Sequence, residues 1–383
     1  MRLETGYPTN RLPNDGNFQR EGTPYTVMID KCFLHIGTEK TGTTSIQEFL
    51  ATNRRRLQAH RYLYPKSPGA LNHLGLTCYA QDDDKFDGVR RLKAVSSRSD
   101  VIRYRASLLA ALDGEIGKSN STAVIFSNEH LSSRLTTTKE LRRLKELCER
   151  YARVTRIIVY IRDQVGFLAS RYIEGIKGGA TRSLTLPIRP GVIRLMDYEK
   201  LLAPWREVFG IDNMHVRRFV NTDFCGGDLL LDFESIIGIS AGVLETSCRR
   251  NSALSQGATE FLREFNNYVP HLLGEIRNPL RGSVVQLLEQ FQDRDPFYVP
   301  AHVAEHVENL FRASNEVVSR DYFNSKYNPL FEKRQTVSVS HASPKGDHAS
   351  DMIRIAAHLW IHQQQELLNC KHSADKSQDG KTT

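Results

Sequence analysis

The stretch LHIGTEKTGTTSIQEFL, residues 34–50, joins an apolar run to a helix-like segment through a loop that is bounded by Gly37 and Gly42. A phosphate-binding loop of the NTPase type reads G-x-x-x-x-G-K-[S/T]. Here Thr43 follows the second glycine, and Lys40 lies inside the loop. A strand, a loop and a helix in this order predict an anion site where backbone N–H groups and the helix dipole favour negative charge. The loop also carries hydroxyl side chains at Thr41, Thr43, Thr44 and Ser45.

Apolar runs and helical patterns alternate through most of the chain. Strands are expected at 32–36, 62–64, 123–126, 156–161 and 215–219, and helices at 44–57, 102–112, 137–151, 164–177, 198–209 and 229–237. Continuous apolar strands that alternate with helices predict a parallel sheet with helices on both faces. We therefore expect an α/β fold, a three-layer P-loop-like sheet. From 257 to about 332 the pattern is helical only, which predicts a helical C-terminal part.

The two ends of the chain read differently from its middle. Residues 1–26 are rich in Pro, Gly, Asn and Thr and lack periodicity, which predicts a flexible N-terminal arm. One domain is expected over 27–332, a linker over 333–350, and a C-terminal amphipathic helix with a tail over 351–383.

The composition favours an enzyme with anionic ligands. The formal charge is +8, but basic and acidic residues are mixed along the chain and no aromatic RNA-binding signature accompanies the basic clusters, so no nucleic-acid partner is expected. The six cysteines form no C-x-x-C pair, which argues against a zinc site or a disulfide framework. Neither a secretory signal nor the ~20 apolar residues of a membrane span is found. We expect a cytoplasmic protein without a membrane span or a metal.

The position of the lysine indicates which phosphate the loop binds. Lys40 projects from the middle of the loop, so it can reach only the group attached to the phosphate that the loop holds. That suits a ligand with one 5′-phosphate bonded to one transferable group. A nucleotide kinase or NTPase with a degenerate loop remains an alternative, although the lysine that should contact the β- and γ-phosphates is absent. A nucleotide-binding module without catalytic activity is another.

These residues carry a family resemblance. The segment HIGTEKTGTTSIQEFL resembles the 5′-phosphosulfate loop of sulfotransferases that use 3′-phosphoadenosine 5′-phosphosulfate (PAPS). The stretch IIVYIRDQVGFLASRY is similar to the family's 3′-phosphate element, which implies that Arg162 and Ser170 bind that phosphate. The family also closes a basic loop over it; Arg249 and Arg250 stand at that place, without the usual R-K-G form. Weaker resemblances to the bacterial, carbohydrate-modifying branch are RYLYP, IFSNEHLS, DYEKLLAPWREVFG, VRRFVNTDFCGGDLLLDFESIIGI, RRNSALS and YNPLF, so that the likeness spans about 31–332.

The resemblance implies transfer of a sulfuryl group from PAPS to a hydroxyl of an acceptor, a carbohydrate or a glycolipid, without a metal. Charge grows on the oxygen that bridges phosphorus and sulfur, and Lys40 is the candidate to stabilise it. A general base must take the proton of the hydroxyl. The candidates, in order, are Glu129, His73 and His130. The 66–98 segment and the region after 257 are expected to line the acceptor side.

Overall fold

The computed structural model describes residues 28–246, 254–290 and 296–332, together with residues 352, 355, 356, 359, 362 and 363. The predicted N-terminal arm and linker, and the candidates Arg249 and Arg250, lie outside the described residues.

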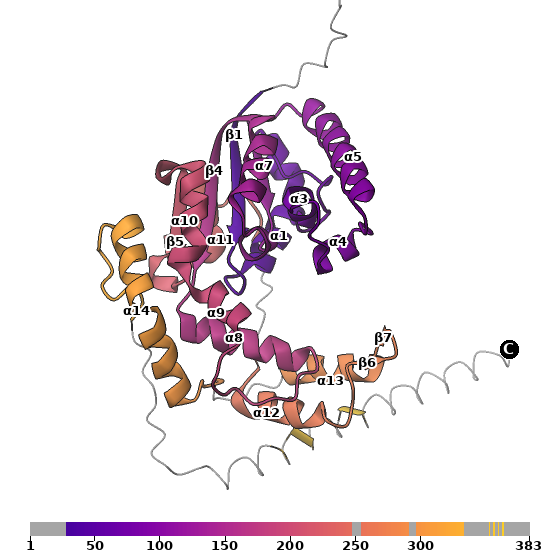
Figure 1. The fold of residues 1–383 in the computed structure, drawn as a ribbon, viewed down its shortest axis with the longest axis vertical. Helices are drawn as coiled ribbons and strands as arrows, with labels where there is room; N and C mark the ends of the chain where they lie inside the picture. Colours follow the sequence, from indigo (N-terminus) through magenta and orange to yellow (C-terminus); the bar gives the residue numbers. More distant parts are fainter. Residues whose placement is uncertain are drawn as a thin grey trace, which may run out of the picture.

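A five-stranded parallel sheet forms the centre of the protein, in the order β2-β3-β1-β4-β5. This confirms the predicted α/β fold (Figure 1). The strands are β1 (Ile29–Gly37), β2 (Tyr62–Leu63), β3 (Ala123–Ser127), β4 (Ala152–Ile161) and β5 (Met214–Arg218). Because successive side chains of a strand point to opposite faces, the apolar runs of β1, β3 and β4 feed two cores. Phe33, Ile125 and Ile158 enter one, and Leu34, Phe126 and Ile157 enter the other.

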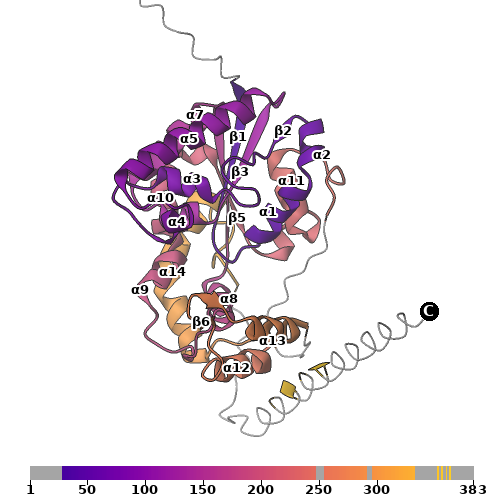
Figure 2. The ribbon, with the colours of Figure 1, turned by 90° about the vertical axis from the view of Figure 1, so that its right-hand side faces the viewer.

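Helices cover both faces of the sheet, and Figure 2 shows the two layers on either side of the strands. One face packs against α1 (Thr43–Thr52), α2 (Arg54–Ala59) and α11 (Leu229–Ile237). The opposite core includes side chains from α3 (Leu74–Ala80), α5 (Arg98–Gly117), α7 (Thr138–Glu149) and α10 (Tyr198–Phe209). Two shorter helices, α4 (Gly88–Leu92) and α6 (His130–Arg134), complete this part.

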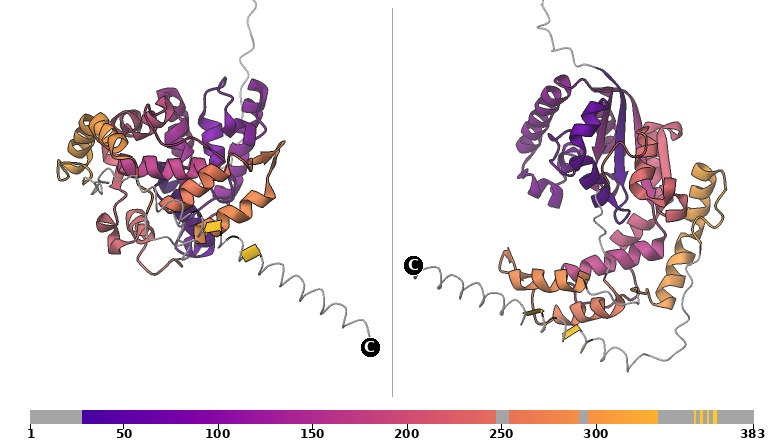
Figure 3. Two further views of the ribbon diagram at one scale, coloured as in Figure 1. Left: turned by 90° about the horizontal axis from the view of Figure 1, so that it is seen from below. Right: turned by 180° about the vertical axis from the view of Figure 1, so that it is seen from behind.

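A helical part lies beyond the carboxyl ends of the strands (Figures 1 and 3). It contains α8 (Gln164–Lys177), α9 (Pro190–Met196), α12 (Gln256–Phe265), α13 (Pro279–Gln290) and α14 (Ala301–Phe323). Helix α14 packs against α8 and α10, and therefore joins this part to the sheet. The expectation of helices only after 257 missed a short antiparallel hairpin, β6 (Leu272–Leu273) and β7 (Ile276–Arg277). Among the described helices, none has the length and apolarity that crossing a membrane requires.

Candidate functional site

The candidate site lies at the carboxyl ends of the three central strands. Strand β1 lies between β3 and β4 and ends at Gly37, the first residue of the loop. The connection that leaves β1 covers one face of the sheet with α1 and α2, whereas the connection that leaves β3 covers the other face with α7. Open α/β sheets bind ligands where neighbouring connections diverge in this way.

The loop is held in shape by its own threonines. Thr38 donates through its amide and its hydroxyl to the carbonyl oxygen of Tyr160, at 3.1 and 3.0 Å. The buried hydroxyl of Thr41 donates to the carbonyl oxygen of Thr38 at 2.7 Å, so its single proton is already used. This geometry assigns the Thr41 hydroxyl to the loop rather than to a ligand. Thr44 is exposed and Ser45 half-buried at the start of α1, and both remain candidates for an anion.

Both the backbone conformation and the packing at position 42 favour glycine. Its φ of 73° is left-handed, and a Cβ at this position would lie 2.3 Å from Cδ2 of Leu229. Thr43, the first residue of α1, is only 7% exposed. Gly37 has a φ of 90°, and an added Cβ would lie 2.9 Å from Cα of Glu129. The loop is thus packed directly against the segment that carries the first candidate base.

Two ion pairs join the loop to α8. The Lys40 ammonium pairs with Glu174, and Arg171 donates to Oε2 of Glu39 at 2.7 Å. The Lys40 side chain is 19% exposed and that of Glu174 is 57% exposed, so solvent screens the pair on one side. Ser170, a predicted ligand of the 3′-phosphate, lies half-buried one turn before Glu174 on the same helix. The candidate lysine therefore contacts the helix that carries the candidate serine.

Arg162 follows directly after β4 and faces the loop. Its Nη1 donates to the carbonyl oxygen of Lys40 at 3.1 Å, and its guanidinium lies 5.7 Å from the centre of the Phe219 ring. The hydroxyl of Tyr198 donates to the carbonyl oxygen of Arg162 at 2.6 Å. Buried Tyr198 thereby fixes the backbone from which the guanidinium projects. The two elements that the sequence assigned to separate phosphates are adjacent in space.

Glu129 lies on the other flank of the loop, after β3. Its Oε2 accepts a hydrogen bond of 2.8 Å from Nε2 of Gln47, which is only 3% exposed. Its Oε1 lies 4.0 Å from Nε2 of His130. Nδ1 of His130 is buried and has no hydrogen-bond partner among the residues that the structure describes. Gln47 thus orients Oε2 of Glu129, and His130 lies next to Oε1 of the same carboxylate.

His73 occupies a different environment from the other two candidate bases. It is fully buried, its Nε2 donates to the carbonyl oxygen of Pro65 at 2.8 Å, and its Nδ1 accepts from the amide of Ser127 at 3.2 Å. Burial lowers the pKa of His73 to about 3. Both ring nitrogens thus hold the 65–73 segment against the end of β3, and the geometry favours a structural role over proton transfer from an acceptor.

Sequence reasoning missed the residues that orient the site. Gln47, Tyr198 and Glu174 belong to three helices. Gln47 and Tyr198 lie in stretches that resemble the family, but no role was predicted for any of the three. Gln47 lies four residues after Thr43 on α1, so its position relative to the loop could be read from helical spacing, but its partner Glu129 could not.

Comparisons with known proteins give a partial likeness. No protein-family model and no solved structure matches the chain. An uncharacterized protein of Archaeoglobus fulgidus is 28% identical over 184 residues, which make up 45% of this chain and 47% of that protein. The chain therefore spans about half the length of the curated relative that it matches.

Proposed function

We propose that the protein is a sulfotransferase that moves the sulfuryl group of PAPS to a hydroxyl of an acceptor, a carbohydrate or a glycolipid. One observation carries this proposal: Arg162 donates to the carbonyl oxygen of Lys40, although the two residues are 122 positions apart. In PAPS the 3′-phosphate and the 5′-phosphosulfate belong to one ribose. A protein that binds both must bring its two anion-binding elements together, as this contact does.

The donor is expected to bind along the loop. Backbone N–H groups at the start of α1, with the hydroxyls of Thr43, Thr44 and Ser45, favour the 5′-phosphate. Arg162 and Ser170 favour the 3′-phosphate, because a guanidinium gives charge-assisted hydrogen bonds to phosphate oxygens. Arg249 and Arg250, outside the described residues, remain predicted as a covering loop.

The reaction is an in-line displacement at sulfur. The acceptor oxygen forms a bond to sulfur while the bond from sulfur to the bridging oxygen breaks, and adenosine 3′,5′-bisphosphate leaves. Lys40 must exchange Glu174 for the bridging oxygen, where it stabilises the charge that grows in the transition state. Glu129 takes the proton of the hydroxyl, and His130 is the second candidate for this role. Exchange is inexpensive because an ion pair with an exposed partner contributes only ~0–1 kcal/mol.

A nucleotide kinase or NTPase fits the same fold but not the same loop. Such enzymes need the lysine after the second glycine, and here that place holds Thr43 with 7% exposure. Lys40 leaves the loop in the direction of α8, where it meets Glu174.

The free thiols at Cys32, Cys78, Cys148 and Cys225 support the proposal that the enzyme works in the reducing cytoplasm.

Transfer itself is the test of this proposal. The purified chain is incubated with sulfur-labelled PAPS and with acceptor panels of free sugars, glycolipids and phenols, without added metal. We expect label in a sugar-containing acceptor and release of adenosine 3′,5′-bisphosphate. Label in none of the panels, together with transfer of the γ-phosphate of ATP by the same preparation, would contradict the proposal in favour of the kinase reading.

A further inference from the structure

A corner of the protein between α4 and α5 exposes large apolar side chains. Phe86, Leu92 and Ile102 are 43%, 77% and 68% exposed. They belong to one short stretch, from the residues before α4 to the first turns of α5, which we call the α4–α5 corner. Exposing apolar side chains to water is unfavourable, and clusters of them mark interaction sites more often than single ones do.

Basic residues alternate with these apolar side chains. Arg91 and Arg98 are exposed and Lys93 is half-buried, and in the described part of the chain none of the three belongs to an ion pair. Arg103, with 77% of its side chain exposed, pairs with Asp100. The α4–α5 corner therefore carries, in the described structure, three basic side chains without an ion-pair partner between apolar groups, next to the carboxylates of Asp84 and Asp87.

The β6–β7 hairpin exposes a second apolar group. Leu272, Leu273 and Ile276 are 47%, 55% and 73% exposed, and the chain turns between them at Gly274 with a φ of 64°. We call these three side chains the hairpin tip. All three side chains are exposed in the described structure.

The base of the hairpin is firmly anchored. The amide of Asn278 donates to the carbonyl oxygen of His271 at 2.9 Å. Nη2 of Arg281 donates to the carbonyl oxygen of Ile176 at 2.8 Å, and this ties the base to the end of α8. The hairpin tip is thus an exposed projection on a fixed support.

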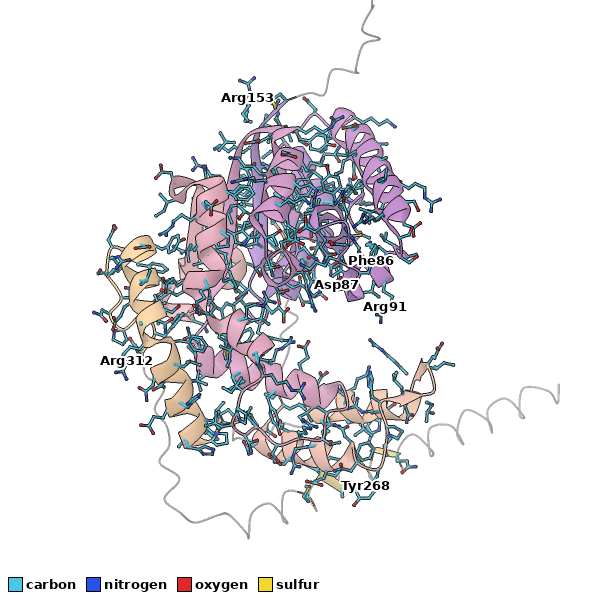
Figure 4. All side chains as sticks on the ribbon, in the orientation of Figure 1. Phe86, Asp87, Arg91, Arg153, Tyr268 and Arg312 are labelled. Atoms are coloured by element: carbon cyan, nitrogen blue, oxygen red, sulfur yellow. The ribbon has the colours of Figure 1, made fainter. Side chains whose placement is uncertain are left out.

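Both apolar groups lie on one side of the molecule. Figure 1 places α4 and the hairpin at the right, on either side of the level at which the strands end, and Figure 2 shows both toward the viewer. Figure 4 shows Phe86 and Arg91 on this side, whereas Arg312 of α14 lies on the opposite side. The elements that carry the α4–α5 corner and the hairpin tip therefore face the same side of the molecule.

We propose that the α4–α5 corner and the hairpin tip dock the protein onto the surface of an anionic lipid bilayer. Apolar side chains that project as two groups from separate elements suit the headgroup and acyl boundary, which needs no complementary shape. Arg91, Lys93 and Arg98, which form no ion pair in the described part of the chain, suit the phosphates of anionic lipids. No described helix is long and apolar enough to cross a membrane, so docking is peripheral.

The docking surface also indicates the class of acceptor, an inference that rests on the proposed function. The docking elements flank the carboxyl ends of the strands, so docking brings the candidate site close to the lipid surface. A hydroxyl borne by the headgroup of a glycolipid is then the acceptor class that this arrangement serves.

Co-sedimentation with vesicles tests the docking surface in the absence of any donor. Phosphatidylcholine vesicles with and without phosphatidylglycerol are compared, at low and high salt. We expect binding to the anionic vesicles only, weakened by salt because the basic residues are exposed. Leu92→Ser and Ile276→Ser should each weaken binding about tenfold, and Arg91→Glu by at least about fivefold.

Matched controls come from other sides of the molecule. Leu310→Ser removes a leucine of α14 that is 45% exposed, and Arg153→Glu makes the same charge change at the amino end of β4. Both should bind vesicles like the parent chain. Equal binding to neutral and anionic vesicles, no binding at all, or a Leu92→Ser variant that behaves like Leu310→Ser would overturn the proposal.

Two further readouts separate this proposal from others. If Leu92→Ser changes the molecular mass of the protein in solution without vesicles, the surface is a contact between copies of the chain and the lipid proposal fails. Binding of adenosine 3′,5′-bisphosphate to Leu92→Ser should equal that of the parent. Absence of vesicle binding by the parent chain therefore rejects docking, whereas absence of bisphosphate binding by the parent chain rejects the proposed function.

Discussion

The guanidinium of Arg162 donates a hydrogen bond of 3.1 Å to the carbonyl oxygen of Lys40. The Lys40 side chain leaves in another direction, toward Glu174 on α8. The backbone of Lys40 therefore contacts Arg162, the residue proposed to bind the 3′-phosphate. The side chain of Lys40, which is proposed to act on the transferred group, contacts α8 instead. Binding and transfer can be tested separately because different atoms serve them.

Replacement of Lys40 should affect transfer more than binding. In Lys40→Ala the charge on the bridging oxygen loses its stabilising ammonium, so kcat is expected to fall by about 10²–10³-fold. The affinity for adenosine 3′,5′-bisphosphate, which lacks the sulfuryl group, should change only a few-fold. Lys31→Ala, which removes an exposed lysine from the other end of β1, should leave both quantities unchanged. Normal turnover by Lys40→Ala would show that another group stabilises the leaving oxygen.

The pH–rate profile distinguishes the candidate bases. Glu129→Gln should lower kcat by about 10²–10⁴-fold and remove the acidic limb of the profile. Gln47→Leu removes the hydrogen bond that orients the Glu129 carboxylate. The kcat should then fall, though less than in Glu129→Gln, because the base is present but no longer held in position. Loss of activity in His130→Gln with activity retained in Glu129→Gln would assign the base to His130 instead.

Gly42→Ala should damage both the fold and the site. Its left-handed φ of 73° strains an alanine, and the Leu229 side chain, whose Cδ2 lies 2.3 Å from the added Cβ, would have to move. We expect the free energy of unfolding in urea to fall by about 1–3 kcal/mol, with weaker bisphosphate binding. Gly88→Ala is the control, because no heavy atom lies within 4 Å of its added Cβ and its φ is not left-handed. Equal stability of the two variants would argue against the left-handed, closely packed backbone at Gly42.

Two buried histidines should make the stability depend on pH. Burial lowers the pKa of both His35 and His73 to about 3, whereas an unfolded histidine has a pKa of about 6.5. Between these values the unfolded chain binds protons that the native chain cannot. Stability is therefore fully present above about pH 6.5 and falls toward pH 3, by about 1.4 kcal/mol per pH unit for each histidine.

Urea denaturation across this pH range checks the slope. His73→Gln should reduce it, since one of the two depressed sites is removed, while His60→Gln, at an exposed position, should not. An unchanged slope in His73→Gln would mean that His73 does not contribute to the acid sensitivity.

Much of the fold follows from the sequence because buried parallel strands are nearly continuous apolar runs. The helix expected at 164–177 and the one at 198–209 agree with α8 and α10 at both ends. The 66–98 segment gave no pattern, although α3 and α4 lie within it. Helix α3 is seven residues long and buried at every residue except Leu74, so it has no polar face from which a helical period could be recognised.

The candidate site, like the fold, could be predicted from the sequence only in part. The loop and Arg162 were predicted from local motifs, and the structure brings them together. The exclusion of His73 from solvent could not be predicted, because it depends on packing against β3, more than fifty positions along the chain. The partnership of Lys40 with Glu174 is also between distant residues, and no spacing rule specifies it.

Replacement of Arg162 should weaken binding of the nucleotide directly. Arg162→Ala removes a charged hydrogen bond worth ~1.5–3 kcal/mol, so the Kd for adenosine 3′,5′-bisphosphate should rise by roughly 10- to 150-fold. Arg153→Ala, at the exposed amino end of the same strand, should bind like the parent. Titration calorimetry gives both values, and equal affinities in the two variants would place the 3′-phosphate elsewhere.

The most direct test of the donor site is calorimetric titration of the parent chain with adenosine 3′,5′-bisphosphate and, separately, with ATP and Mg²⁺. Arg162 beside the loop predicts tight binding of the bisphosphate without any metal, and much weaker binding of ATP. Preference for ATP with Mg²⁺, or no binding of the bisphosphate, would contradict the account.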